Sequence, residues 1–269
     1  MPRNKRSRLR ADRPNPSGVH FLVSKDVLDT LVRTCTPGPD DLVLDLGAGP
    51  GVVTAALART HARVLAVERD PEFVRTLNSR FRHNDRVRVI QADIRTVALP
   101  RRDFLVVANP PYSLSTPLLR RLLGGRRPNL RSAALIVEWG FAKRVTTPVP
   151  ASRELAWWAS RFDIRLVRKV PADHFRPQPT VDSAVLAIRR RPLSRTTEIL
   201  LGEILDAVER SPYRSAHALV RRIGLGDARR LLKRCDIEPG RRAATITPRE
   251  WRRVAETVSA RLGRGTDAV

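Results

Sequence analysis

Apolar residues follow two alternating patterns along the first 190 residues of the chain. Short apolar runs, typical of buried strands, occur at 42–46, 63–67, 87–91, 104–108, 133–137, 164–170 and 183–189. Segments with helical spacing lie between several of these runs, at 25–35, 53–59, from 71 onward and from 116 onward. Strands that alternate with helices favour an α/β architecture with a mostly parallel, doubly wound sheet.

Beyond Pro192 the apolar residues keep only the helical spacing. The last helix has a clear start signal, the capping box Thr247-Pro248-Arg249-Glu250 with proline at the first helical position. We therefore expect a small all-helical domain after the sheet domain. The predicted parts are a basic flexible arm at 1–17, a sheet domain at 18–191 and a helical domain at 192–269.

The charge of the chain narrows the class of protein. Among 269 residues, 51 Lys and Arg stand against 27 Asp and Glu, a formal net charge of +24. This excludes an ordinary acidic metabolic enzyme and favours a polyanionic partner such as nucleic acid. The chain lacks both an apolar run of about 18 residues and a signal-peptide pattern, so we expect a cytoplasmic protein that does not bind membranes. Cys35 and Cys235 lie outside any Cys/His cluster, so we expect neither a metal nor a disulfide.

A glycine-rich turn follows the first strand of the sheet domain. Residues 45–51 read Asp-Leu-Gly-Ala-Gly-Pro-Gly, so a strand ends in an acid and continues through a GxGxG turn into a helix. Glycines at Gly47 and Gly49 allow a ligand to lie against the backbone at the carboxyl edge of the sheet. Dinucleotide-binding enzymes use a similar turn, but with GxGxxG spacing, which this chain lacks. The alternative is a tight strand-to-helix turn that binds no ligand.

Acidic residues follow the next two strands. Glu68 ends the strand at 63–67, where its carboxylate can accept hydrogen bonds from both hydroxyls of a ribose, and Asp93 follows the strand at 87–91, where it can accept from an exocyclic amine. The alternatives are a solvated acid at Glu68 and a helix N-cap at Asp93. Together with the glycine turn, the two acids predict a nucleoside pocket.

The segment Asn109-Pro110-Pro111-Tyr112 follows the buried strand at 104–108. An exocyclic amine on a base is a poor nucleophile because its lone pair is delocalised into the ring. If the Asn109 side-chain oxygen and the Pro110 carbonyl both accept from the amine, its lone pair is directed at a donor carbon, and Tyr112 offers a face on which an unstacked base can lie. The alternative is a Pro-Pro turn without catalytic function.

In this order, the segments DLGAGPG, AVERD, QADI and NPPY resemble class I S-adenosylmethionine-dependent adenine-N6 methyltransferases. The segment 138–144, EWGFAKR, is similar to the EYGFAKR of the erythromycin-resistance (Erm) rRNA methyltransferase family, and 175–179, FRPQP, to its FxPxP loop. This resemblance runs from about Val19 to the C-terminus. It implies a Rossmann-like, mostly parallel seven-stranded sheet with a small C-terminal helical domain that binds RNA.

The resemblance also implies a set of site residues. The residues expected to line the S-adenosyl-L-methionine site are His20, Leu22, Gly47, Gly49, Glu68, Asp93, Ile94 and Asn109. Tyr112 and Phe175 are expected to flank the target adenine, beside the catalytic Asn109 and Pro110. Val19 stands where the family usually has Gln, and Trp139 where it usually has Tyr.

The implied reaction is mono- or dimethylation of N6 on one adenine in the peptidyl-transferase loop of 23S rRNA, which confers macrolide-type resistance. The expected partner is free or partly assembled 23S rRNA, and the expected state is a monomer. Three alternatives remain: a housekeeping 16S rRNA adenine dimethyltransferase, a DNA adenine-N6 methyltransferase and a non-catalytic nucleic-acid-binding protein on the same fold. The EWGFAKR segment favours the Erm-like enzyme over the first of these.

Overall fold

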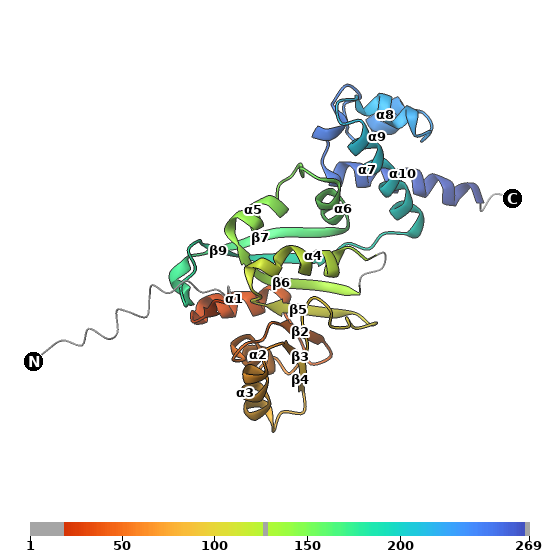
Figure 1. Ribbon diagram of the computed structural model, residues 1–269. Helices are drawn as coiled ribbons and strands as arrows, with labels where there is room; N and C mark the ends of the chain where they lie inside the picture. The colour runs from red at the N-terminus through yellow and green to blue at the C-terminus, as the bar shows by residue number, and fades with distance from the viewer. Residues whose placement is uncertain (1–18, 126–128, 267–269) are drawn as a thin grey trace, which may run out of the picture. The chain divides into compact units, whose positions relative to one another are not determined.

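The computed structural model describes residues 19–125 and 129–266, and within them seven strands form one twisted sheet (Figure 1). The strands are β2 (Leu42–Leu46), β3 (Arg63–Glu68), β4 (Val87–Gln91), β5 (Phe104–Ala108), β6 (Leu130–Glu138), β7 (Phe162–Val170) and β9 (Ser183–Arg190). Their order across the sheet is β4-β3-β2-β5-β6-β9-β7. The five neighbouring strands β4, β3, β2, β5 and β6 are parallel to one another, and β9 runs antiparallel to β6. The predicted mostly parallel seven-stranded sheet is confirmed.

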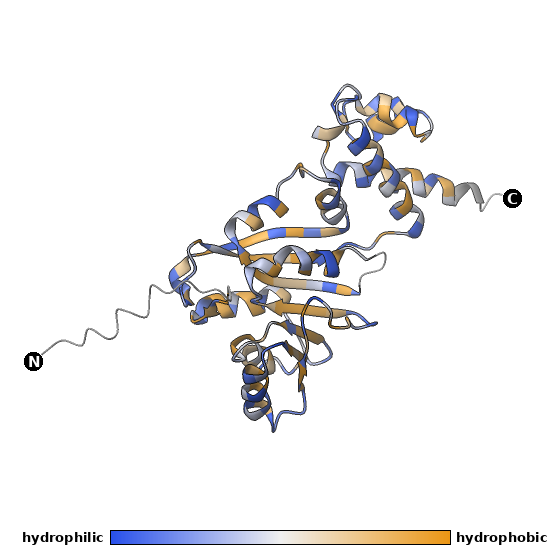
Figure 2. Cartoon of the chain, in the orientation of Figure 1, coloured by the Kyte–Doolittle hydropathy of each residue, from blue (hydrophilic) through white to orange (hydrophobic). Residues whose placement is uncertain are grey.

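The buried strands explain why the sheet forms in the middle of this sequence. All five residues of β2 and all five of β5 are buried, as continuous apolar strands covered on both faces should be. In Figure 2 the strands are largely orange, which matches this burial. The helices of the sheet domain are α1 (Lys25–Cys35), α2 (Val52–Ala58), α3 (Pro71–Phe81), α4 (Ser115–Leu123) and α5 (Trp139–Val145).

One apolar cluster joins alternate residues of the strands to α1 and α2. Val43, Leu105 and Ile136 project from neighbouring strands into this cluster together with Leu31 and Leu57 of the two helices. Alternate residues of a strand point to one face of a sheet, so this cluster forms the core on that face. The same core contains two residues expected at the functional site, Leu22 and Phe175.

A small two-stranded sheet was not predicted from the sequence. β1 (Phe21–Leu22) pairs antiparallel with β8 (Phe175–Arg176), with Phe21 opposite Arg176. Two-residue strands are too short to show periodicity, so sequence patterning cannot reveal them. The pairing attaches residues near the N-terminus to the FRPQP loop. Two 3₁₀ segments, Tyr112–Leu114 and Ala172–His174, lie in neighbouring loops.

The remaining helices form a second compact unit with its own apolar core. They are α6 (Arg153–Arg161), α7 (Arg195–Arg210), α8 (Ala216–Arg222), α9 (Ala228–Arg234) and α10 (Pro248–Thr266), with a 3₁₀ segment at Ala243–Thr245. Trp251 and Val254 of α10 are buried in this core. The predicted capping box is present, because the Thr247 N–H donates to Glu250 Oε2 at 2.8 Å and the Glu250 N–H donates to Thr247 Oγ1 at 3.3 Å.

The boundary between the two units differs from the one expected at residue 192. The chain divides into residues 1–142 with 165–189 and residues 143–164 with 190–269. The reason is the packing of α6, whose Trp157 lies against the helical core. The Arg161 guanidinium, nearly buried, forms an ion pair with Glu198 of α7 at 2.9 Å.

The predictions about the N-terminal arm, membrane spans and metal sites can be compared with the described residues only. The predicted basic arm at 1–17 lies outside the described residues. Within the described ranges, no helix is long and apolar enough to cross a membrane. The same ranges contain no group of three or more His, Cys, Asp or Glu side chains that could hold a metal ion.

Candidate active site

A pocket of about 820 Å³ lies at the carboxyl ends of β2, β3 and β5, where open α/β sheets bind ligands. Its volume falls within the range usual for small-molecule sites. The pocket brings together all eight residues that the sequence assigned to the cofactor: His20, Leu22, Gly47, Gly49, Glu68, Asp93, Ile94 and Asn109. The sheet therefore gathers residues from segments far apart in the chain into one cavity.

The glycine turn has a backbone that side chains would disturb. Gly49 has a positive φ of 52°, and a Cβ there would lie 3.1 Å from Cε1 of Phe21. Gly51 has φ of 83°, and a Cβ there would lie 2.7 Å from Leu77 of α3. Gly49 thus allows β1 to close over the turn, whereas Gly51 allows α2 and α3 to pack closely. Gly47, which also has a positive φ, is at the pocket wall.

Glu68 connects the glycine turn to the end of β3. Its Oε2 accepts from the Gly49 N–H at 2.8 Å, and its Oε1 accepts from the N–H groups of Arg69 at 2.7 Å and Asp70 at 2.8 Å. Each carboxylate oxygen offers about two acceptor positions, so Oε2 keeps a free one, and Glu68 lines the pocket. Glu68 therefore holds the turn in place and can still accept a hydrogen bond from a ligand hydroxyl.

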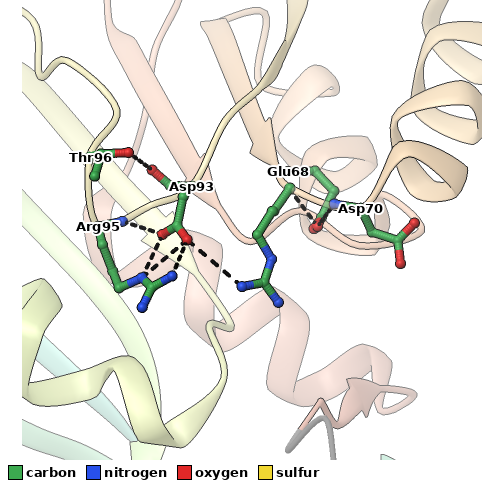
Figure 3. Close-up of polar contacts among 6 residues, drawn as sticks. Glu68, Asp70, Asp93, Arg95 and Thr96 are labelled. Atoms are coloured by element: carbon green, nitrogen blue, oxygen red, sulfur yellow. Dashed lines mark hydrogen bonds and ion pairs between the residues drawn. The ribbon is translucent and has the colours of Figure 1, made fainter.

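The Asp93 carboxylate is bound by two arginines at the rim of the pocket (Figure 3). Arg95 donates from Nε to Oδ1 at 3.0 Å and from Nη2 to Oδ2 at 2.6 Å, and Arg69 Nη1 lies 3.8 Å from Oδ2. The hydrogen bonds from Arg95 lower the Asp93 pKa to about 2. Asp93 is thus ionised at neutral pH, and the Arg95 guanidinium occupies acceptor positions of its carboxylate.

Asp93 also caps the turn that follows it, although no helix begins there as the N-cap alternative supposed. Its Oδ1 accepts from the Arg95 N–H at 2.8 Å, and its carbonyl accepts from the N–H groups of Thr96 at 3.0 Å and Val97 at 2.9 Å. Arg121 of α4 donates to the Ile94 carbonyl at 2.7 Å and also to the Val97 carbonyl. The turn and the arginine from α4 together fix the loop that places Asp93 and Ile94 in the pocket.

Asp45 lies directly under the glycine turn and is fully buried. Its Oδ2 accepts from the Thr54 hydroxyl at 2.6 Å, whereas its Oδ1 has no hydrogen-bond partner among the described residues. Burial raises the Asp45 pKa to about 7, and the hydrogen bonds from Thr54 oppose the shift. The carboxyl group is therefore held partly protonated near neutral pH.

The raised pKa predicts how stability depends on pH. Because the folded-state pKa lies above the unfolded value, the folded protein keeps a proton that the unfolded chain has released. The stability that this bound proton contributes is lost as pH rises from about 4 to about 7. Asp45→Asn removes the titration and keeps an acceptor for Thr54. Between pH 5 and pH 8 its free energy of unfolding should gain about 3 kcal/mol relative to the wild type.

Urea unfolding followed by tryptophan fluorescence at the two pH values measures this change. Asp40→Asn, at an exposed position, serves as the matched control and should track the wild type. Equal pH dependence of Asp45→Asn and the wild type would show that the buried carboxyl does not titrate in this range.

Asn109 has its amide orientation set by the protein. Its Nδ2 donates to the His20 carbonyl at 2.8 Å, and its Oδ1 accepts no hydrogen bond from a described residue. Asn109 lines the pocket, so a free acceptor oxygen is available there. His20 is held in turn, because its Nδ1 donates to the Pro177 carbonyl at 2.8 Å. The β1–β8 pairing thus positions the acceptor that the sequence placed at the centre of the chemistry.

The other predicted catalytic residues are placed beside the pocket and not along its wall. Pro110 is buried next to the glycine turn. The Tyr112 ring lies 5.4 Å from the His20 ring, centroid to centroid, and the Tyr112 hydroxyl forms a hydrogen bond with Ser183 Oγ. Burial raises the Tyr112 pKa, so its hydroxyl stays protonated at neutral pH. Tyr112 therefore contacts the pocket through His20.

Phe175 differs from its predicted role. Its side chain has no exposed surface and packs in the core with Leu22 and Val170. The ring cannot flank a base in this arrangement, because β8 turns it toward the core when it pairs with β1. The FRPQP loop contributes Pro177 to the pocket wall instead.

Several pocket residues were not found from the sequence. They include Phe73, Arg69, Arg95, Ser113 and Leu114. Arg69 directly follows Glu68, and Arg95 is two residues after Asp93, so their closeness in sequence to the predicted acids was an available signal. Phe73 meets Phe21 edge-on at 5.5 Å, and its helical position in α3 gave no indication that it would reach the pocket.

The fold and the position of this pocket define a class I methyltransferase. The crystal structure of the 23S rRNA methyltransferase ErmE superposes with a TM-score of 0.76 over 89% of this chain and 99% of that chain, at 24% identity, and this likeness concerns the fold. The family model for ribosomal RNA adenine dimethylase matches residues 15–256. The chain belongs to this family.

Curated relatives agree with the family. The chain is 32% identical over 256 residues to the rRNA adenine N-6-methyltransferase of Bacillus anthracis, with 93% of this chain and 88% of that protein covered. It is 34% identical over 253 residues to the probable ribosomal RNA small subunit methyltransferase A of Haloarcula marismortui, with 88% and 86% covered. The protein is an rRNA adenine N6-methyltransferase, which confirms the predicted enzyme class.

Proposed function

We propose that this enzyme transfers methyl groups from S-adenosyl-L-methionine to N6 of a single adenine in the peptidyl-transferase loop of 23S rRNA. The observation that carries the catalytic part is the state of Asn109. One N–H of its amide donates to the His20 carbonyl, and its amide oxygen accepts no hydrogen bond from a described residue. The bond to His20 fixes which end of the amide is the nitrogen, so the oxygen is presented as an acceptor to an incoming amine.

The pocket fits the nucleoside part of this cofactor. The glycine turn lets the ligand lie against the backbone, Glu68 Oε2 can accept from a ribose hydroxyl, and Asp93 can accept from the base amine. When bound, the cofactor supplies an electrophilic methyl group. Ile94 and Leu22 offer apolar contacts for the base and the adjoining chain.

The protein residues act by positioning the target amine. In this proposal the Asn109 oxygen at the pocket accepts from one N–H bond of the amine, and the carbonyl of Pro110, the next residue beside the pocket, accepts from the other when the amine enters, which directs the nitrogen lone pair toward the methyl donor. Tyr112 supports the site from beside it, with its ring against His20. The proton released after transfer goes to solvent, so the site needs no strong base.

The 23S target is favoured over the 16S alternative by the segment Glu138–Arg144, EWGFAKR, which resembles the Erm family. In the structure this segment ends β6 and forms most of α5. An adenine in an RNA loop leaves its stack at lower cost than a paired base. Methyl groups on its N6 add bulk and remove hydrogen-bond donors beside the macrolide site, so resistance should follow.

The test combines the site of methylation with the phenotype. The wild type and Asn109→Ala are incubated with protein-free 23S rRNA, with assembled 50S subunits and, in parallel, with 16S rRNA and small subunits, and primer extension maps the modified base. We expect one stop in the peptidyl-transferase loop of free 23S rRNA, little on assembled 50S subunits, and macrolide resistance on expression in a sensitive bacterium. Modification confined to 16S rRNA would transfer the assignment to the housekeeping enzyme, for which the Haloarcula relative is the precedent.

The Asp93–Arg95 pair leads to a prediction about cofactor affinity. If the base amine binds Asp93, it must displace the Arg95 guanidinium from the same carboxylate. Because Arg95 is half exposed and such pairs are worth about 0–1 kcal/mol, Arg95→Gln should tighten binding by about 2- to 5-fold. Calorimetry with S-adenosylhomocysteine at low and high salt measures this effect, and salt should improve the wild type more than the variant.

The matched control for this prediction is Arg75→Gln, because Arg75 also pairs with an acid, Glu72, but on the exposed face of α3. It should leave affinity unchanged. Weaker binding by Arg95→Gln would show instead that Arg95 supports the bound cofactor.

A further inference from the structure

Tyr213, in the turn between α7 and α8, has its side chain almost entirely in solvent. It is 83% exposed, the highest value among the large apolar side chains of the described residues. A single exposed apolar residue is common on protein surfaces and by itself indicates nothing. The surroundings of Tyr213 decide whether the exposed ring has a function.

The backbone on both sides of Tyr213 is fixed. The Ala244 N–H donates to the Pro212 carbonyl at 3.2 Å, and the Ala243 N–H donates to the Arg214 carbonyl at 2.8 Å. The tyrosine thus projects from a turn that is bonded to the 3₁₀ segment Ala243–Thr245. An ordered backbone that presents a ring to solvent loses little conformational entropy when the ring is contacted.

Three cations lie close to Tyr213 along the backbone. Arg214 is adjacent to it, Arg210 ends α7 just before the turn, and Arg242 forms an isolated β-bridge with Ser215. All three side chains are exposed, and none forms an ion pair with a described residue. The turn that carries the ring is therefore flanked along the backbone by exposed cations that form no ion pair with a described residue.

The adjoining helices α8 and α9 extend this positive charge. They pack against each other and bury Leu219 and Leu231 in the helical core. Their solvent sides carry the exposed cations Arg221, Arg222, Arg229, Arg230, Lys233 and Arg234. Between residues 216 and 234 the single acid is Asp227, which caps α9 through the Arg230 N–H at 3.1 Å. We call Tyr213, Arg210, Arg214, Arg242 and these six cations the Tyr213 surface.

We propose that the Tyr213 surface binds an unpaired stretch of the RNA substrate, with one base stacked on the Tyr213 ring and the adjoining phosphates on the cations. An aromatic ring among arginines is what single-stranded RNA requires, because every base has a face that stacks and every nucleotide carries a phosphate. Double-stranded RNA would meet the cations but would offer no free base face. An acidic protein would meet the charge without needing an exposed ring.

This inference rests on the proposed action on RNA, and it adds a second point of contact that lies wholly within the helical unit. Its role is binding and not chemistry. We therefore expect it to affect the affinity for RNA and the KM for rRNA, and to leave kcat and cofactor affinity unchanged.

The first test uses the full-length protein and a fluorescein-labelled 12-nucleotide oligouridine, with anisotropy as the readout. Tyr213→Ala should weaken binding by roughly 5- to 100-fold, and Tyr213→Phe should bind within about 2-fold of the wild type, because stacking needs the ring and not the hydroxyl. Ile199→Ala is the matched control, since Ile199 is 54% exposed on α7 but lies about 16 Å before its end. Unchanged affinity of Tyr213→Ala would overturn the proposal.

Salt dependence separates the ring from the cations. The double variant Arg222→Gln/Arg230→Gln should reduce the slope of log affinity against log salt, by about 0.7 for each phosphate that the variant no longer neutralises, whereas Tyr213→Ala should keep the slope. A lower slope for Tyr213→Ala, with no change in the double variant, would contradict the division of roles. Melting temperatures should be unchanged in all of these variants because the altered side chains are exposed.

The second test measures methylation of protein-free 23S rRNA. Tyr213→Ala should raise KM with kcat unchanged, and equal KM values would overturn the substrate role of the surface. The two tests distinguish a failure of the Tyr213 surface from a failure of the proposed 23S target. If the wild type leaves 23S rRNA unmodified while oligouridine binding still depends on Tyr213, the target assignment fails and the RNA-binding surface remains. If methylation occurs and Tyr213→Ala behaves as the wild type in both tests, the surface fails and the target remains.

Discussion

Asn109→Ala should reduce kcat for methyl transfer by about 100- to 1,000-fold, the scale found when one positioned hydrogen-bonding group is removed from a reacting centre. The free Oδ1 of Asn109 is the acceptor that orients the target amine, and alanine has none. Cofactor affinity should change much less, because the glycine turn and Glu68 remain in place. Single-turnover kinetics with labelled cofactor measure the chemical step directly.

The hydrogen bond from Asn109 Nδ2 to the His20 carbonyl requires a control, because its loss could loosen β1. Asn109→Asp keeps an acceptor oxygen and loses the donor. It should therefore retain more activity than Asn109→Ala if the acceptor carries the effect, and no more if the contact with His20 does. Asn78→Ala, at an exposed position of α3, should be silent. Full kcat in Asn109→Ala would remove Asn109 from the mechanism.

The core of the fold was predictable because its strands are continuous apolar runs. β2 and β5 are buried along their whole length, and the acids and the asparagine follow directly where such strands end. Carboxyl ends of parallel strands meet at one edge, so sequence order alone was sufficient to bring Gly47, Glu68 and Asn109 together. The eight predicted cofactor residues lie in one pocket for this reason.

The features that the sequence did not reveal depend on contacts between distant segments. The pairing of β1 with β8 involves two residues from each strand, too few to leave a period, and it decides that Phe175 faces the core and not the pocket. The position of α6 is likewise decided by where Trp157 finds apolar partners. Local patterns identify which residues become buried, but not which of two cores buries them.

The arginines near the active site show a second limit of the same kind. Arg69 and Arg95 read in the sequence as ordinary basic surface residues in a chain of net charge +24. In the structure both approach Asp93, and Arg95 holds its carboxylate with paired hydrogen bonds. Charge composition predicts a polyanionic partner for the whole protein, but it does not show that individual cations pair with acids inside the predicted pocket.

Glu68→Ala should weaken binding of S-adenosylhomocysteine by about 1.5–3 kcal/mol, the range for hydrogen bonds to a charged group. Two effects combine in this loss. The variant removes the acceptor proposed for the ribose, and it leaves the N–H groups of Gly49, Arg69 and Asp70 without their shared carboxylate. Gly49 thereby loses its bond to the end of β3, although the N–H groups of Gly47 and Ala48 still donate to the Val67 carbonyl at 2.9 and 3.0 Å, so the pocket loses part of its fixed shape as well as a hydrogen-bond acceptor.

Glu68→Gln separates the two effects, because its amide keeps one acceptor oxygen in place of two. If the carboxylate acts mainly by holding the turn, the amide can satisfy either Gly49 or the pair Arg69 and Asp70, and the loss of affinity should be intermediate. Calorimetry on folded variants, checked by circular dichroism, gives the affinities, and Glu72→Gln at an exposed position of α3 is the control. Wild-type affinity in Glu68→Ala would place the cofactor elsewhere than over the glycine turn, because a ligand that lies against Gly49 should respond to the loss of the carboxylate that holds the Gly49 N–H.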